Sequence, residues 1–80
     1  MKLLIQYDTS VGIFYIGQSE DGRFHPIFDN EDLGSYLKAW QASEDLANDV
    51  TFSVLHPETG ELLDTSEFGI PEDPTEWDRI

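Results

Sequence analysis

The chain has 80 residues, no cysteine, and 17 acidic against four basic residues, which give a formal net charge of −13. This length allows one domain with one small core, and the lack of cysteine excludes disulfides and thiolate metal sites. The charge argues against direct binding to nucleic acid and to anionic membranes, because their phosphates would repel it.

Hydrophobic residues make up 39% of the chain and include five Phe, three Tyr and two Trp. This is enough apolar surface to predict a single folded domain over residues 1–80. The hydrophobic stretch that precedes Gln6 is too short for a signal peptide or a membrane span. We therefore expect a cytoplasmic protein.

The charge is uneven along the chain. The residues from Trp40 onward contain eleven acids and one base, Arg79, and so carry −10, whereas residues 1–39 carry −3. Such a potential attracts basic protein surfaces, but it also keeps a small protein soluble and monomeric. Both interpretations stay open at this point.

The first part of the chain predicts strands joined by tight turns. Residues 2–7 (KLLIQY) and 11–18 (VGIFYIGQ) have strand composition and are separated by Asp8-Thr9-Ser10, which favours a turn. Ser19-Glu20-Asp21-Gly22 is the strongest turn signal, because Asp-Gly tolerates a positive φ. We expect a β-hairpin there.

The strand after this turn, residues 23–29, alternates in character. Phe24, Pro26 and Phe28 point to one side, and the residues between them point to the other. Because Pro26 has no amide hydrogen, this strand is an edge of the sheet or its Pro26 amide position faces outward.

Residues 29–32 (DNED) predict a solvated acidic loop. Gly34 falls at the sixth place of an EF-hand spacing that begins at Asp29, which invites a calcium interpretation. The spacing then fails, because Leu33 and Trp40 stand where oxygen ligands are needed.

Residues 35–37 predict a further short strand before the helix, and residues 39–48 (AWQASEDLAN) predict an amphipathic helix. We expect its packed stripe to contain Trp40, Ser43 and Ala47, with Ala39 and Leu46 beside them. Alternatively, Ser43 is itself the N-cap and the helix is only a turn or two long.

The second half predicts another hairpin and an irregular tail. Residues 50–55 (VTFSVL) and 61–64 read as strands around a turn at residues 56–60. In the tail, Asp73-Pro74-Thr75-Glu76 predicts an N-cap and a short terminal helix through Trp77. The predicted fold is α+β: a mainly antiparallel sheet of four or five strands, one short helix on it, and a short C-terminal helix.

Two resemblances accompany these patterns. The pattern GR-F-H, LGSY, DLA and TF, followed by FGIPEDPTEWDRI, resembles a group of small uncharacterised bacterial proteins with a Gly-Ile-Pro-Glu-Asp-x-x-Glu-Trp-x-Arg-like tail. It covers residues 12–80 and implies no activity. A weaker likeness over residues 13–47 is to HicB-type antitoxins, in which strands with an Asp-Gly hairpin precede a helix. It implies a partial ribonuclease-like fold, without the DNA-binding tail that autoregulation needs.

Residues suited to catalysis are few. His25 and His56 each precede a proline, a context that favours extended backbone, and we predict that both lie on the surface. The segment around Ser35 lacks the second glycine of a nucleophile elbow, and adjacent carboxylates such as Glu44 and Asp45 diverge on a helix. We therefore predict no enzyme, no cofactor and no metal site.

The favoured function is a non-enzymatic protein-binding or regulatory module that covers a basic partner surface through its acidic second half. The predicted partner-binding residues mix carboxylates with apolar anchors: Glu67, Phe68, Glu72, Asp73, Glu76 and Trp77. In the competing interpretation, Phe68, Ile70 and Trp77 pack the tail onto its own domain. The alternatives are a nucleic-acid mimic that inhibits a DNA-binding protein, and a small hydrolase or ligand-binding domain with a pocket near His25 and Tyr36.

Overall fold

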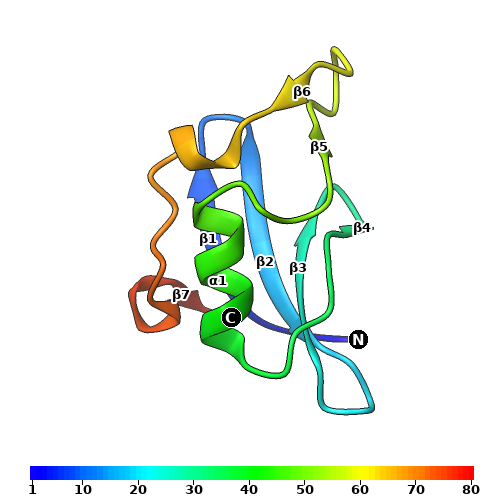
Figure 1. Ribbon diagram of the computed structural model, residues 1–80, viewed down its shortest axis with the longest axis vertical. Coiled ribbons are helices and arrows are strands. Elements are labelled where there is room, and N and C mark those ends of the chain that lie inside the picture. The colour runs from blue at the N-terminus through cyan, green and yellow to red at the C-terminus, as the bar shows by residue number, and fades with distance from the viewer.

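The computed structural model describes all 80 residues and has an α+β fold, with one helix across a five-stranded antiparallel sheet (Figure 1). The strand order is β4-β3-β2-β1-β7, and β5 and β6 form a separate two-stranded sheet. The elements are β1 (Lys2–Thr9), β2 (Gly12–Gln18), β3 (Phe24–Phe28), β4 (Glu31–Asp32), α1 (Ala39–Ala47), β5 (Val54–Leu55), β6 (Leu62–Leu63), the 3-10 helices η1 (Thr65–Glu67) and η2 (Pro74–Glu76), and β7 (Asp78–Arg79).

The hairpin between β2 and β3 is confirmed. Gly22 has a φ of 84°, and its amide donates to the Ser19 carbonyl at 2.9 Å. The acidic loop that follows β3 is tighter than predicted, because Asp29 and Asn30 both have positive φ, as in a two-residue type I′ turn. The chain therefore folds straight back, and Glu31–Asp32 forms β4 against β3.

Pro26 lies inside the sheet, with β2 on one side and β4 on the other, so β3 is not an edge strand. Its carbonyl accepts from the Leu33 amide at 2.8 Å, on the side away from β2. The N and C=O of one residue point to the same side of a strand, so the Pro26 nitrogen also faces away from β2. The amide hydrogen that proline lacks would therefore point to the irregular segment that follows the short β4. The Pro26 nitrogen faces this covering segment between Leu33 and Tyr36 and does not point outward, so neither predicted alternative is observed.

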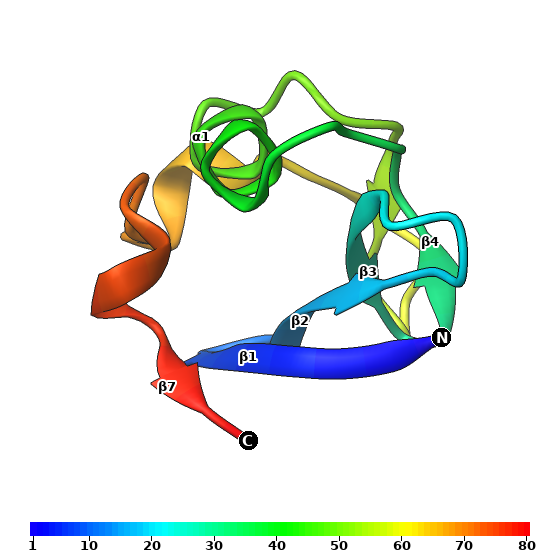
Figure 2. The same cartoon turned by 90° about the horizontal axis from the view of Figure 1, so that it is seen from below.

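The core lies between α1 and one face of the sheet (Figure 2). Phe14 and Phe28 stack in it with ring centroids 4.3 Å apart. The helix begins at Ala39, so an N-cap at Ser43 is wrong. Its buried residues are Ala42, Ser43 and Leu46, whereas Trp40 is 52% exposed. The prediction that Trp40 lies on the packed stripe is thus wrong. Ala42, Ser43 and Leu46 face the core instead, and the small Ala42 and Ser43 let the helix approach its neighbours closely.

The predicted strand over residues 50–55 is reduced to Val54–Leu55, which pairs with Leu62–Leu63. Phe52 is 72% exposed. The turn at residues 56–60 is confirmed, so the second hairpin exists, but it is short. The predicted strand over residues 35–37 is likewise only a bridge between Tyr36 and Phe24.

The tail is fixed to the body by its apolar residues. Ile70 and Trp77 are buried, Phe68 is half-buried, and the Trp77 Nε1–H donates to the Pro71 carbonyl at 2.9 Å. The Asp73 carboxylate caps η2 by accepting from the Thr75 amide, as predicted, although the helix is a single 3-10 turn. A seventh strand, which the sequence did not predict, follows Trp77 and pairs with β1. No helix of the fold has both the length and the apolar character needed to cross a membrane.

The two tryptophans give opposite predictions for stability. Trp77→Ala removes a buried ring and should lower the free energy of unfolding by about 3–5 kcal/mol. Trp40→Ala removes a half-exposed ring and should cost less than about 1 kcal/mol. Urea unfolding followed by circular dichroism measures both, and equal losses would contradict the arrangement of the core.

Candidate functional site

The acidic surface is almost free of ion pairs. All the acidic residues except the half-buried Asp45 are exposed. The only ion pair within 4.0 Å joins His25 and Asp32, and no Lys or Arg pairs with a carboxylate. Arg23 instead donates to the hydroxyl and carbonyl oxygens of Ser35. The carboxylates are therefore not neutralised within the molecule, and their field extends into solvent.

The predicted partner-binding residues separate into two groups. Glu67, Glu72, Asp73 and Glu76 are exposed, whereas Trp77 is 4% exposed. The indole of Trp77 thus anchors the tail in the chain's own core, as the competing interpretation held. Hydrogen bonds from the backbone and the hydroxyl of Thr75 hold the pKa of Asp73 below its ordinary value.

An exposed aromatic cavity lies at the start of α1, and we name it the Trp40 cavity. Its volume is about 420 Å³, and its lining residues are Arg23, Ser35, Tyr36, Leu37, Trp40, Gln41, Glu44 and Asp45. The Tyr36 backbone is fixed by two hydrogen bonds to Phe24, at 2.8 Å each. Leu37 is 65% exposed beside it. Trp, Tyr and Arg are the residue types that contribute most to binding at protein interfaces.

Burial raises the pKa of Tyr36 to about 12, and the neighbouring Asp45 carboxylate adds to the rise because it favours the phenol over the phenolate. The hydroxyl is therefore a neutral donor throughout the physiological range. The predicted pocket near His25 and Tyr36 does not form as expected, since His25 lines none of the cavities.

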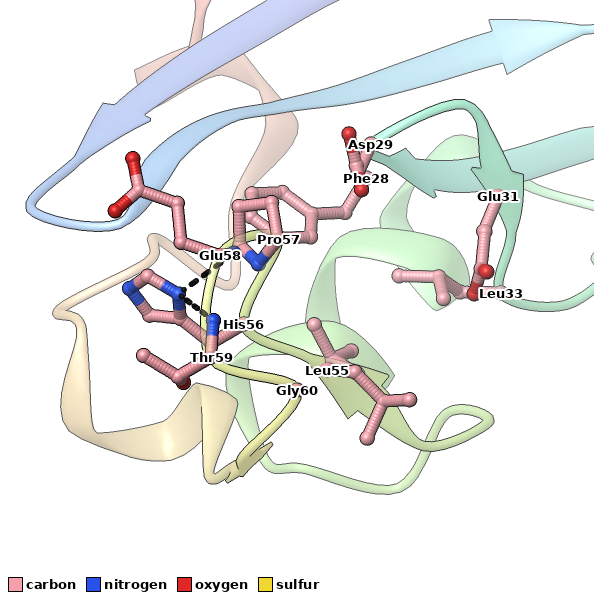
Figure 3. Close-up of a pocket in the computed structure, with 11 residues that line it drawn as sticks. Phe28, Asp29, Glu31, Leu33, Leu55, His56, Pro57, Glu58, Thr59 and Gly60 are labelled. Carbon is pink, nitrogen blue, oxygen red and sulfur yellow. Dashed lines mark hydrogen bonds between the residues drawn. The ribbon is translucent and has the colours of Figure 1, made fainter.

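A second cavity, the Leu33 cavity, lies between the β3–β4 turn and the turn at residues 56–60 (Figure 3). Its volume is about 440 Å³, and its lining residues are Phe28, Asp29, Glu31, Leu33, Val54, Leu55, His56, Pro57, Glu58, Thr59 and Gly60. The His56 Nδ1 accepts from the amides of Glu58 and Thr59, at 3.1 and 3.3 Å. The imidazole thus shapes the wall of this cavity from within the turn.

His25 is buried, so its predicted surface position is wrong. Its Nδ1 lies 2.9 Å from an Asp32 carboxylate oxygen, and its Nε2 lies 3.0 Å from the Ser19 hydroxyl. Ser19 in turn contacts Asp21, and this hydroxyl and the Arg23 amide hold the pKa of Asp21 below its ordinary value. We name these four residues the His25 chain. The sequence could not show it, because it depends on β4, where Asp32 pairs with Ile27 and lies diagonal to His25.

The His25 chain has the same order of contacts as the triad of serine hydrolases. Its surroundings, however, are suited to a different role. The neighbours of the Ser19 hydroxyl, apart from His25, are the Asp21 carboxylate and the Arg23 carbonyl, which are acceptors and would oppose a developing oxyanion. We interpret the His25 chain as a set of side-chain contacts that holds the β2–β3 turn against β4.

Comparison of the chain with protein-family models, with curated proteins and with solved structures found no match. The two resemblances drawn from the sequence therefore stay predictions, and the site is interpreted from its own geometry.

Tyr36 predicts a specific dependence of stability on pH. Folding raises the pKa of the Tyr36 hydroxyl from 10.0 to about 12. The protonated hydroxyl therefore contributes fully to the free energy of unfolding below pH 10, and this contribution is lost as the pH rises toward 12. Phenolate absorbance should show one tyrosine that ionises near pH 12 and is missing in Tyr36→Phe. A Tyr36 that ionises at its ordinary pKa would contradict the environment described here.

The structural role of the His25 chain is also testable. Ser19→Ala removes the hydroxyl between His25 and Asp21, and should lower the free energy of unfolding by about 1 kcal/mol in urea titrations. A fluorophosphonate probe should leave the wild-type chain unlabelled. Labelling of the wild type that disappears in Ser19→Ala would show a nucleophilic serine and overturn the structural interpretation.

Proposed function

We propose that this chain is a non-enzymatic protein-binding or regulatory module of the cytoplasm, which attracts a basic partner and anchors it at the Trp40 cavity. The observation that carries the proposal is the exposed Trp40, grouped with Tyr36 and Arg23 on a surface whose acids have no Lys or Arg partner. The absence of cysteine fits a reducing compartment.

The charge supplies attraction at long range. Unpaired carboxylates of one sign accelerate encounter with a surface of the opposite sign, and this effect weakens as salt screens it. Glu67, Glu72, Asp73 and Glu76 contribute to this field from the tail, and their side chains are exposed to an approaching partner. A partner guided this way carries clustered Lys and Arg.

The Trp40 cavity supplies attraction at short range. Trp40 and Leu37 place large apolar surfaces in solvent on a molecule whose core already holds nine buried hydrophobic residues. A partner that covers these two side chains would remove apolar area from water. The Tyr36 backbone is already held in place by its two hydrogen bonds to Phe24, so it loses little freedom on binding. Glu44 and Asp45 line the same cavity and would face basic groups of that partner.

A binding experiment with a matched aromatic control tests the proposal. Partners captured from lysate at low salt are identified, and their affinity is measured in purified form over a range of salt concentrations. Affinity should fall as salt rises, and Trp40→Ala should weaken binding by about 30-fold, the equivalent of about 2 kcal/mol. The control Phe52→Ala removes an exposed aromatic outside the Trp40 cavity and should weaken binding less than about 3-fold.

Three results would contradict the proposal: no specific partner, a partner whose affinity ignores salt, or equal effects of Trp40→Ala and Phe52→Ala. Both variants are first checked by urea unfolding, so that a loss of binding is not a loss of fold. A captured DNA-binding protein that DNA displaces would instead favour the nucleic-acid mimic.

A further inference from the structure

We propose that the Leu33 cavity is a docking site for an arginine side chain of the basic partner. This inference rests on the proposed function for the class of partner, but the cavity is separate from the Trp40 cavity and shares no lining residue with it. Three properties of the cavity support this assignment: its apolar floor, the sign of the charges around it, and the hydrogen bonds that hold its walls.

The floor of the cavity is apolar and belongs to the core. Phe28, Leu33 and Val54 are each at most 4% exposed, and Leu55, which is half-exposed, lies beside them. A volume of about 440 Å³ falls within the range of roughly 300–1,000 Å³ that is typical of ligand pockets. The three methylenes of an arginine can lie along such a floor while its head group stays near the rim.

The rim is acidic and carries no Lys or Arg. Asp29, Glu31 and Glu58 line the cavity, and Figure 3 shows the Glu31 side chain beside Leu33, whereas the Glu58 carboxylate points away from Leu33 beyond Pro57. None of the three carboxylates has a hydrogen-bond or ion-pair partner in the chain. Asp29 and Glu31 flank Asn30 in the tight β3–β4 turn, so both belong to the same wall of the cavity.

The walls are set before a ligand arrives. The β3–β4 turn is held by strand pairing of Glu31 with Phe28. The opposite turn is held by the hydrogen bonds that two backbone amides donate to the His56 ring. The turn residues therefore lose little freedom when a side chain enters. This arrangement distinguishes the cavity from a group of acids on a mobile loop.

Arginine fits these properties better than the other side chains. An apolar side chain would fill the floor but leave the carboxylates without a partner, and an acidic one would be repelled. The guanidinium presents several donors in a plane, can donate to two carboxylates at once, and is less strongly hydrated than an ammonium group. Arginine thus satisfies the floor and the rim together.

The inference is tested with a small probe, so no partner has to be known. N-acetyl-arginine amide is titrated into the wild-type chain at low salt, and amide chemical shifts are followed by NMR. The shifts should be concentrated at Leu33, Leu55, Glu58 and Thr59. N-acetyl-citrulline amide, which has the same shape without the charge, should bind at least about 5-fold more weakly.

Charge-matched variants separate the cavity from the overall field. Asp29→Asn/Glu31→Gln should remove the preference for arginine over citrulline, and the asparagine preserves a residue that tolerates the φ of 52° at position 29. The control Asp8→Asn/Glu20→Gln loses the same charge at exposed acids outside both cavities and should keep the preference. Dispersed spectra confirm that each variant is folded.

The inference is overturned by the absence of shifts at the cavity, by shifts spread evenly over the acidic surface, by equal binding of citrulline, or by equal effects of the two double variants. These outcomes are distinct from failure of the proposed function. A partner that binds through Trp40 and ignores Asp29→Asn/Glu31→Gln would leave the proposed function standing and overturn the cavity. Specific binding of the arginine probe with no partner found would do the reverse.

Discussion

The burial of Trp77 is the contact on which the arrangement of this molecule depends. The ring lies 5.9 Å from that of Tyr7 on β1, and its indole nitrogen holds the Pro71 carbonyl. With Trp77 in place, the next two residues reach β1 and become β7. The tail before it comes close enough to α1 for the buried Ser43 hydroxyl to donate to the Glu72 carbonyl at 2.6 Å. One aromatic side chain thus joins the sheet, the helix and the tail.

This contact also decides what remains on the surface. A chain of 80 residues has room for one small core, and here Trp77, Phe14, Phe28 and Ile70 take much of it. Trp40 is left half-exposed at the start of α1, where small residues on the opposite side of the helix face the core. The two tryptophans therefore exchange the roles that the sequence predicts for them: the predicted anchor for a partner is structural, and the predicted core residue is available for contact.

The parts of the fold that depend on neighbouring residues could be predicted from the sequence. The Asp21-Gly22 turn, the helix from Ala39 and the Asp73 cap each have a local chemical cause, and all three are present. The parts that depend on distant residues could not. β7 requires a partner strand more than seventy residues away in the chain. β4 lies next to β3 in sequence, but it requires two non-glycine residues, Asp29 and Asn30, to adopt positive φ together, which their residue types allow without enforcing. The His25 chain depends on β4, and each cavity joins segments that are not adjacent in sequence, so only their individual residues were visible in the sequence.

The acidic residues do not all play the same part. Asp21, Asp32, Asp49, Asp64 and Asp73 accept hydrogen bonds from nearby amides or side chains, and so support turns, caps and the His25 chain. The glutamates differ, since Glu72 alone has a side-chain hydrogen bond, from Asn48.

Like charges held on a small surface repel one another, and without Lys or Arg partners that repulsion reduces the stability of the fold. These five aspartates offset part of this cost locally, whereas the glutamates other than Glu72 do not. Because Glu31 lines the Leu33 cavity and Glu44 lines the Trp40 cavity, these unpaired glutamates, rather than the net charge as a whole, link the acidity of the chain to its two candidate sites.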